Sequence, residues 1–237
     1  MTNDESCRGV CVKRLTNRFG AWHKRRYNAF TLIELVVVFA LILVLSGLVL
    51  STVGYVRKKA ARARAETEIA AMSAACESYK ADNGTYPRDP TANTATDSLN
   101  ARTMFDPASA NATLYKTASL VLYRALSGDR NLDRNVTTLD ENFNIDGTTL
   151  TPPLSQLPQS YFTFKPNMLS PANQTQNVQY IQDPFSNSYG YSTIQAATQD
   201  TTKGYNPTFD LWSTAGVAPS PTPSPPTTQQ DLWIKNW

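Results

Sequence analysis

A single carboxylate, Glu34, lies inside the most apolar stretch of the chain. It is the only charged side chain among the 21 residues of segment 30–50. A stretch of this length and composition is enough to cross about 30 Å of hydrocarbon as a helix. A charge in such a segment is costly unless it reaches the interface or meets a partner. Glu34 therefore either extends to the aqueous interface or neutralises a group of opposite charge.

The residues before this stretch form a basic leader. Residues 1–29 contain seven Lys and Arg but only two acidic residues, whereas the rest of the chain is slightly acidic. An ordinary secretory signal has an apolar core of about 7–15 residues with small residues at a cleavage site beyond it. Here the apolar run is longer, and the small residue Ala29 precedes it instead. Cleavage after Ala29 would remove the leader and leave the whole apolar segment on the product.

The sequence FTLIELVVVFALILVL, residues 30–45, resembles the N-terminus of type IV prepilins and type II secretion pseudopilins. The likeness to the major pseudopilin continues in three shorter stretches and, more loosely, in the C-terminal DLWIKNW. The three are YKADNGTYP (79–87), DPFSNSYGY (183–191) and FDLWSTAG (209–216). Residues 88–160 are rich in Thr, Asn and Ser and form an insertion that the resemblance does not cover. The first motif is highly specific, and the later ones occur in the expected order.

The resemblance implies a processing step and an assembly step. In that family a membrane peptidase cuts before the Phe and methylates the new amine, which places the cut between Ala29 and Phe30. Phe30 then becomes the N-methylated first residue. Ala29 replaces the family's usual Gly, which puts the efficiency of this cut in question. Glu34 takes the fifth mature position, where the resemblance implies that it pairs with the Phe30 amine of a neighbouring subunit and sets the axial register.

No set of residues that could carry catalysis is visible in the mature chain. The only histidine, His23, lies in the leader, and no glycine-rich phosphate loop occurs. Cys7 and Cys11 are also in the leader, so Cys76 is a lone thiol that we expect to pack as a small apolar side chain. Because the basic residues concentrate in the leader, nucleic-acid binding is not expected. The sequence favours a structural protein that is not an enzyme.

Calcium is the one cofactor that the resemblance suggests. Major pseudopilins bind it after the Asp-x-x-Ser-x-Gly strand, but here Val217 and Ala218 replace the family's Asp-Gly. Asp231 is the carboxylate left near that site, and one carboxylate is a poor site for a hard cation. Residues 129–140 space Asp and Asn like an EF-hand loop, but Arg134 replaces the turn glycine. We therefore expect no cofactor, with calcium at Asp231 as the alternative.

A long helix has to position the N-terminal residues. No proline occurs between Met1 and Tyr86, so one helix can extend from Phe30 to about Asn83, which is ~80 Å. Asn83-Gly84 followed by Pro87 predicts its end. Its second half carries an apolar stripe at helical spacing that we expect to cover the core of a globular domain. The stripe consists of Ile69, Met72, Cys76 and Tyr79.

The rest of the chain predicts shorter elements. The insertion contains one helix, which Ser127-Gly128 ends and whose apolar face is formed by Leu114, Ala118, Val121, Leu122, Ala125 and Leu126. YFTFK (161–165), the two motif stretches and the C-terminal stretch predict a small antiparallel sheet. Residues 217–230, VAPSPTPSPPTTQQ, are rich in Pro and predict a loop or a polyproline II segment.

These elements predict an α+β, pilin-like fold with three regions. Residues 1–29 are a cytoplasmic leader that is removed on processing. Residues 30–56 are a transmembrane and assembly helix. Residues 57–237 are a periplasmic globular domain, in which the second half of the long helix packs on a C-terminal antiparallel sheet. Basic residues on the two sides of the span almost balance, so the motif, rather than the charge, places the leader in the cytoplasm.

The function that we favour is a structural subunit of a pseudopilus-like filament assembled from the bacterial inner membrane for type II protein secretion. The implied partners are further copies of the chain, the prepilin peptidase and methyltransferase, minor pseudopilins and an inner-membrane assembly platform. One alternative is a type IV pilin or minor pilin for adhesion, motility or DNA uptake. The other, from a different class, is a membrane-anchored periplasmic binding module that does not polymerise.

Overall fold

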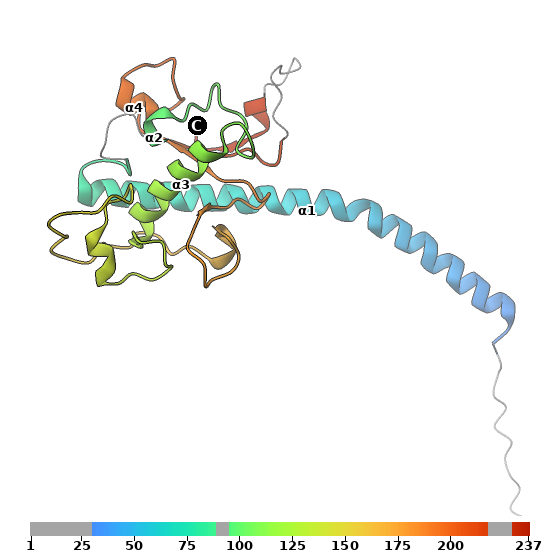
Figure 1. Cartoon of the computed structure of the whole chain (residues 1–237). Coiled ribbons are helices and arrows are strands. Elements are labelled where there is room, and N and C mark those ends of the chain that lie inside the picture. The colour runs from blue at the N-terminus through green and yellow to red at the C-terminus, as the bar shows by residue number, and fades with distance from the viewer. Residues whose placement is uncertain (1–29, 89–94, 218–228) are drawn as a thin grey trace, which may run out of the picture. The chain divides into compact units, whose positions relative to one another are not determined.

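The computed structural model describes residues 30–88, 95–217 and 229–237 (Figure 1). The chain divides into two compact units, Met1–Ser51 and Thr52–Trp237. Helix α1, Leu32–Asn83, is 52 residues long and contributes to both units. The long helix predicted from the sequence is therefore confirmed.

The first unit contains the apolar beginning of α1. Its large side chains are exposed, from 49% for Val37 to 82% for Phe30 and Leu32. By length and composition, α1 is the one helix among the described residues that is able to cross a membrane. Apolar side chains on every side of a helix are typical of a segment surrounded by lipid or by other apolar helices.

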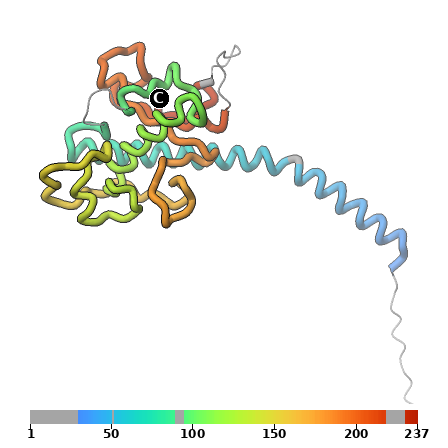
Figure 2. The backbone as a smooth tube through the Cα atoms, viewed as in Figure 1, coloured from blue at the N-terminus to red at the C-terminus, as the bar shows by residue number. Residues whose placement is uncertain are grey.

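The second unit combines the rest of α1 with short helices and strands (Figure 2). The helices are α2 (Ala95–Ser98), α3 (Ala112–Ser127) and α4 (Ile194–Thr198), and the 3-10 helices are η1 (Thr138–Asn142), η2 (Pro166–Met168) and η3 (Gln229–Leu232). The strands are β1 (Leu169–Ser170), β2 (Tyr180–Ile181), β3 (Gly190–Ser192), β4 (Asp210–Ser213) and β5 (Ile234–Lys235).

The described strands form two antiparallel sheets. β1 pairs with β2, with Leu169 opposite Ile181. The larger sheet has the order β3-β4-β5, with Trp212 of β4 opposite Gly190 on one side and Lys235 on the other. The three strands of this sheet come from the three C-terminal motif stretches, so the predicted small antiparallel sheet is confirmed.

One segment expected to add a strand has a different role. The N–H groups of Tyr161 and Phe162 both donate to the carbonyl oxygen of Leu126, at 2.7 and 2.9 Å. Tyr161 and Phe162 therefore close the C-terminal end of α3, and residues 161–165 do not form a strand. The prediction was wrong because the last carbonyls of a helix need donors, and this segment supplies them.

The helix predicted in the insertion is confirmed as α3. Gly128 follows it with a φ of +82°, a left-handed conformation that ends the helix at little steric cost. Most of the predicted apolar face is buried, and α3 lies against β2 and β3. Of the Pro-rich stretch predicted as a loop, residues 218–228 lie outside the described part of the chain, and its last two residues begin η3.

The apolar stripe predicted on α1 is buried in the core of the second unit. Ile69, Met72 and Cys76 are at most 4% exposed, and Tyr79 is partly buried. Burial raises the pKa of the Cys76 thiol, which keeps it protonated and confirms its role as a packing residue. The surrounding core comes from α3 and from the strands and loops of the sheets, with Leu122, Leu126, Ile181, Tyr189, Tyr191 and Leu211.

A buried carboxylate adds a polar contact to this packing. Glu68 of α1 is 8% exposed and accepts a hydrogen bond from the Tyr189 hydroxyl at 2.7 Å. Its other oxygen is 2.6 Å from Nε of Arg64, one turn earlier on the helix. A buried carboxylate is tolerated only when such donors satisfy it. The side chain of Glu68 thus fixes which face of α1 meets the sheet.

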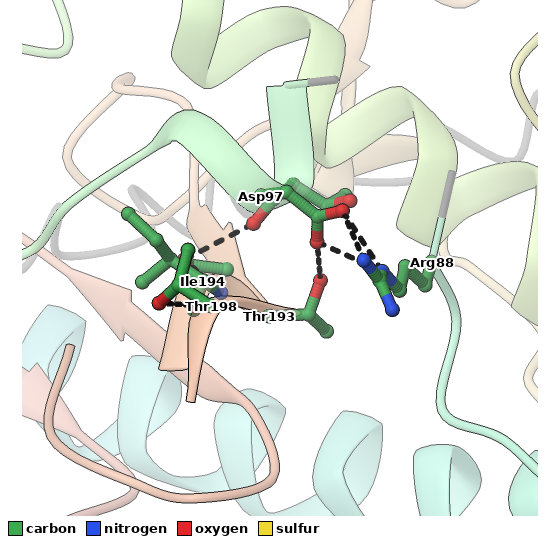
Figure 3. A network of polar contacts seen from close by, with 7 residues as sticks. Arg88, Asp97, Thr193, Ile194 and Thr198 are labelled. Atoms are coloured by element: carbon green, nitrogen blue, oxygen red, sulfur yellow. Dashed lines mark hydrogen bonds and ion pairs between the residues drawn. The ribbon is translucent and has the colours of Figure 1, made fainter. Parts of the chain in front are cut away.

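A second polar network holds the chain directly after α1 (Figure 3). Nε of Arg88 donates to both oxygens of Asp97 in α2, at 3.0 and 2.8 Å. Thr193, which precedes α4, donates from its hydroxyl to the same carboxylate at 2.8 Å. Asp97 therefore links the segment that follows α1 to the turn between β3 and α4.

Gly190 is a position where packing demands a glycine. A Cβ atom at this residue would overlap the indole ring of Trp212, which is fully buried. We expect Gly190→Ala to lower the free energy of unfolding by about 1–3 kcal/mol, because an overpacked core has to shift. Thermal or denaturant unfolding of the full chain in detergent measures the change. Gly54→Ala adds the same methyl group into open space and is expected to leave stability equal or slightly raised.

The Glu68–Tyr189 hydrogen bond gives a second prediction. Tyr189→Phe leaves the buried carboxylate without its hydroxyl donor and should cost about 1–3 kcal/mol in the free energy of unfolding. Tyr180→Phe is the matched control, because the Tyr180 ring lies beneath Lys116 and the change should stay within about 0.5 kcal/mol. Equal losses in the two variants would contradict a specific role for the Tyr189 hydroxyl.

Candidate processing and assembly site

The residues singled out by the sequence lie at the first turn of α1. Phe30 and Thr31 precede the helix, and Phe30 is the first residue that the structure describes. The Phe30 side chain is 82% exposed. Ala29, on the other side of the expected cut, lies outside the described residues. The structure thus places the expected new N-terminus directly before a helix.

Glu34 has a partner within its own chain that the sequence analysis missed. The N–H and the hydroxyl of Thr31 donate to Oε2 of Glu34, at 3.0 and 2.9 Å. In return, the N–H of Glu34 donates to the Thr31 hydroxyl oxygen at 3.3 Å. This reciprocal pair is a capping box, formed by a Thr before the helix and a Glu at its third residue. The side chain of each residue accepts a hydrogen bond from the backbone N–H of the other. The spacing Thr-x-x-Glu in FTLIE was the signal that could have revealed it.

The capping box determines where the carboxylate of Glu34 sits. It holds the side chain back toward the start of the helix, where the helix dipole favours negative charge. All the hydrogen bonds from Thr31 use one carboxylate oxygen, Oε2. Among the described residues, no hydrogen bond to the other oxygen, Oε1, is formed. Glu34 can therefore cap its own helix and still accept a further donor.

The surface around Glu34 is apolar. Leu32, Ile33, Leu35 and Val36 are exposed by 50% or more. In lipid or against other apolar helices, a carboxylate at this position would interact more strongly with a cation than it does in water, because such surroundings have a low dielectric constant. The arrangement is thus suited to binding a positive group from outside the chain, since Oε1 of Glu34 accepts no hydrogen bond from the described residues.

The carboxylates of the later motifs are structural. Asp183, 2% exposed, accepts from the N–H groups of Phe185 and Asn187 at 2.9 and 2.8 Å and from the Ser213 hydroxyl. Asp210, 1% exposed, accepts from the N–H groups of Tyr205 and Asn206 at 2.9 and 2.8 Å. Burial raises the pKa of both carboxyl groups. Each holds a turn beside the larger sheet, which explains why these motifs contain an aspartate.

The residues considered for calcium form no group that could hold a metal ion within the described part of the chain. Asp231 is exposed in η3, and no three His, Cys, Asp or Glu side chains of the described part of the chain are grouped so that they could hold a metal. In the EF-hand-like stretch, the oxygens of Asp140 accept from the N–H groups of Arg130, Asn131 and Thr137. These oxygens organise the loop itself. Calcium at Asp231 stays a hypothesis, because the neighbouring residues 218–228 lie outside the part of the chain that the structure describes.

Comparison with known proteins finds two similarities. Residues 24–50 match the family model of the prokaryotic N-terminal methylation motif. Over 64 residues the chain is 38% identical to the type II secretion system core protein G of Aeromonas hydrophila. This similarity covers 27% of the chain and 45% of that relative, so the matched region spans less than half the relative's length. No solved structure matches the chain.

The motif match contains the same residues that form the start of α1. It includes the basic end of the leader, the residues on both sides of the expected cut and the capping box. The arrangement of one long helix against small antiparallel sheets is pilin-like as well. The N-terminal segment of this chain thus carries the N-terminal methylation motif of type IV pilins and pseudopilins.

Proposed function

We propose that the protein is a structural subunit of a pseudopilus-like filament that is assembled from the bacterial inner membrane. The observation that carries the proposal is the start of α1, where Phe30 and the Thr31–Glu34 capping box stand at the head of an apolar helix behind a basic leader. This helix has the length to span the membrane and the apolar surface to pack against other copies. The protein acts by assembling and not by catalysis.

Processing generates the group that Glu34 needs. Removal of residues 1–29 by the prepilin peptidase leaves an amine on Phe30, which the same enzyme methylates and which stays positively charged. In the filament, this amine pairs with Glu34 of a neighbouring subunit. Oε1 of Glu34 accepts no hydrogen bond from the described residues, which supports the proposal, since the capping box occupies only the other oxygen. A pair of opposite charges in an apolar core is favourable only when the two groups meet in good geometry. The pair would therefore fix the axial register between neighbouring subunits.

The three regions follow from this role. We propose residues 1–29 as the cytoplasmic leader, 30–56 as the membrane and assembly helix, and 57–237 as the periplasmic domain. Further copies of the chain form the filament shaft, while minor pseudopilins and the inner-membrane assembly platform start and extend it. Residues 88–160 are the insertion that contains α3. We propose that they give this subunit a surface on the filament that the resemblance to the major pseudopilin does not account for.

Export is the favoured purpose of the filament, supported by the similarity to the secretion core protein of Aeromonas hydrophila. A type IV pilin or minor pilin for adhesion, motility or DNA uptake is the second candidate, because the methylation motif is shared by both classes. Deletion of the gene separates the two. Loss of exported proteins from the medium would favour secretion, and loss of surface movement or DNA uptake with normal export would favour a pilus.

The cut between Ala29 and Phe30 gives the third prediction. Mass analysis of the protein purified from membranes should find an N-terminal, methylated Phe30. Ala29→Glu, which places a bulky charge at the cut, should leave the full-length chain in the membrane. Ala29→Gly is the control and should be processed at least as fast as the natural sequence. A mature chain beginning at Met1, or beyond Val56, would contradict the proposal.

The fourth prediction separates the two roles of Glu34. Glu34→Gln keeps an oxygen that can accept from Thr31 but removes the charge, whereas Thr31→Ala weakens the cap and keeps the charge. We expect Glu34→Gln and Glu34→Val to reach normal membrane levels and to be processed, but to form little or no polymer after shearing or crosslinking. Thr31→Ala should still polymerise.

The opposite pattern would overturn the pairing. If Glu34→Gln polymerises like the natural protein and Thr31→Ala does not, Glu34 acts only as a helix cap. Loss of membrane insertion in Glu34→Val would also contradict the proposal, because the change removes a costly charge from an apolar segment. The membrane-anchored binding module, the alternative that does not polymerise, predicts no effect of any of these variants on oligomerisation.

A further inference from the structure

Four basic residues follow closely on the apolar beginning of α1. Arg57, Lys58, Lys59 and Arg62 lie within six residues of one another and are called the basic turn below. The first three are exposed, and Arg62 is partly exposed. Neither the methylation motif nor the buried stripe of α1 includes them. Like charges at neighbouring positions of a helix repel one another, so the cluster is unfavourable until counter-charges balance it.

The described part of the chain supplies little counter-charge to the basic turn. None of the ion pairs that its residues form includes a member of the basic turn. The guanidinium of Arg62 donates to the carbonyl oxygen of Leu232 at 2.8 Å, and that partner is neutral. The closest acidic residues in the sequence are Glu66, four residues after Arg62, and Asp231, next to Leu232. Two carboxylates balance at most two of the four charges, so the basic turn needs negative groups from outside the chain.

The basic turn shares a helix face with the buried stripe of α1. Ala65, seven residues after Lys58, is fully buried, and Ile69, eleven residues after it, is 4% exposed. Residues seven and eleven positions apart lie on the same face of an α-helix, and so do residues four apart, such as Lys58 and Arg62. The contact of Arg62 with Leu232 places η3 beside this face. The basic turn therefore lies where α1 enters the second unit.

The residues around the basic turn are typical of a membrane boundary. Tyr55 and Val56, directly before it, are 71% and 59% exposed, and Leu232 of η3 is 46% exposed. Tyrosine is enriched at membrane–water boundaries, because its ring is apolar and its hydroxyl is polar. Lysine and arginine keep their charge in water while their stems cover apolar surface. Along α1, the apolar segment, the tyrosine and the basic turn thus follow one another in the order of hydrocarbon, boundary and headgroups.

We propose that the basic turn binds the phosphate groups of anionic phospholipids in the leaflet where α1 leaves the membrane. Basic side chains next to a spanning segment are attracted by anionic headgroups. In the proposed orientation these charges oppose insertion, because basic residues favour the cytoplasmic side. Anionic headgroups offset that cost. The proposal rests on the membrane anchoring of α1 proposed above, but not on filament assembly.

Lipid retention by the mature chain tests the proposal. A chain that begins at Phe30 lacks the basic leader, so the leader does not contribute to lipid binding. It is placed in nanodiscs with equal amounts of phosphatidylcholine and phosphatidylglycerol that carry the same acyl chains, extracted in a mild detergent and purified. Mass spectrometry then counts the two retained lipids. We expect at least about fivefold more phosphatidylglycerol, since a single basic residue near an anionic surface contributes about that factor.

Neutral variants identify the residues that bind the lipid. Lys58→Gln removes one exposed charge and should lower the preference for phosphatidylglycerol, and together with Lys59→Gln it should bring the ratio of the two lipids close to one. Lys80→Gln is the matched control. It makes the same change on the same helix, about 33 Å further along, and should retain lipids as the natural protein does.

Several results would overturn the proposal. Equal retention of the two lipids by the natural protein would do so, as would an equal loss in Lys58→Gln and Lys80→Gln. If the Lys58→Gln, Lys59→Gln variant keeps its lipid preference but forms less polymer, the basic turn contacts another subunit and the proposal is wrong. A natural protein that prefers phosphatidylglycerol but forms no polymer would contradict the filament and still support the lipid site.

Salt provides a second measurement that needs no variant. Washing the natural protein at about 1 M salt, where charges are screened beyond about 3 Å, should lower the excess of phosphatidylglycerol. An excess that high salt leaves unchanged would contradict binding by the basic turn, even if the variants failed to fold.

Discussion

One continuous helix has to satisfy two environments, and the rest of the structure depends on how it does so. The first part of α1 exposes apolar side chains on every side, which is stable only in lipid or against other apolar helices. The second part buries a single stripe against a protein core. Because no proline interrupts it, the backbone hydrogen bonds continue from one environment to the other. The same secondary structure therefore serves both the apolar segment, which is suited to a membrane, and the folding of the second unit.

Carboxylates with matched donors recur in this structure. Glu34 accepts from Thr31 at the start of α1, Glu68 from Tyr189 and Arg64 in the middle, and Asp183 and Asp210 from backbone N–H groups beside the larger sheet. In each case the position is costly for a charge, and fixed donors compensate. Hydrogen bonds of this kind are directional, so they set register and orientation where apolar contacts alone would allow sliding. Asp129 departs from this rule, since one of its oxygens lacks a donor among the described residues.

Local sequence patterns predicted those features of the fold that depend on residues close together in the sequence. The length of α1, its buried stripe and the end of α3 at Gly128 all follow from residue patterns within one element, whereas the strand β4 was expected from the resemblance. The role of residues 161–165 did not, because a Phe- and Tyr-rich segment can pair as a strand or close a helix. Only the position of the Leu126 carbonyl decides between them. A cavity lined by residues of α3 and of the segment around Phe164 was equally hidden, since it forms only where separate segments of the chain converge.

The capping box shows why the residue at this position is a glutamate. Capping alone requires only an acceptor that reaches back to the N–H of Thr31, and a glutamine meets that requirement as well. Charge pairing alone requires only a carboxylate near the helix start, which an aspartate supplies with one methylene less reach. A side chain that caps through one oxygen and presents the second to a neighbour's amine has to be both long and charged. Glu34 meets both conditions, and in the proposed filament its cap would fix in advance where the amine of a neighbouring subunit is received.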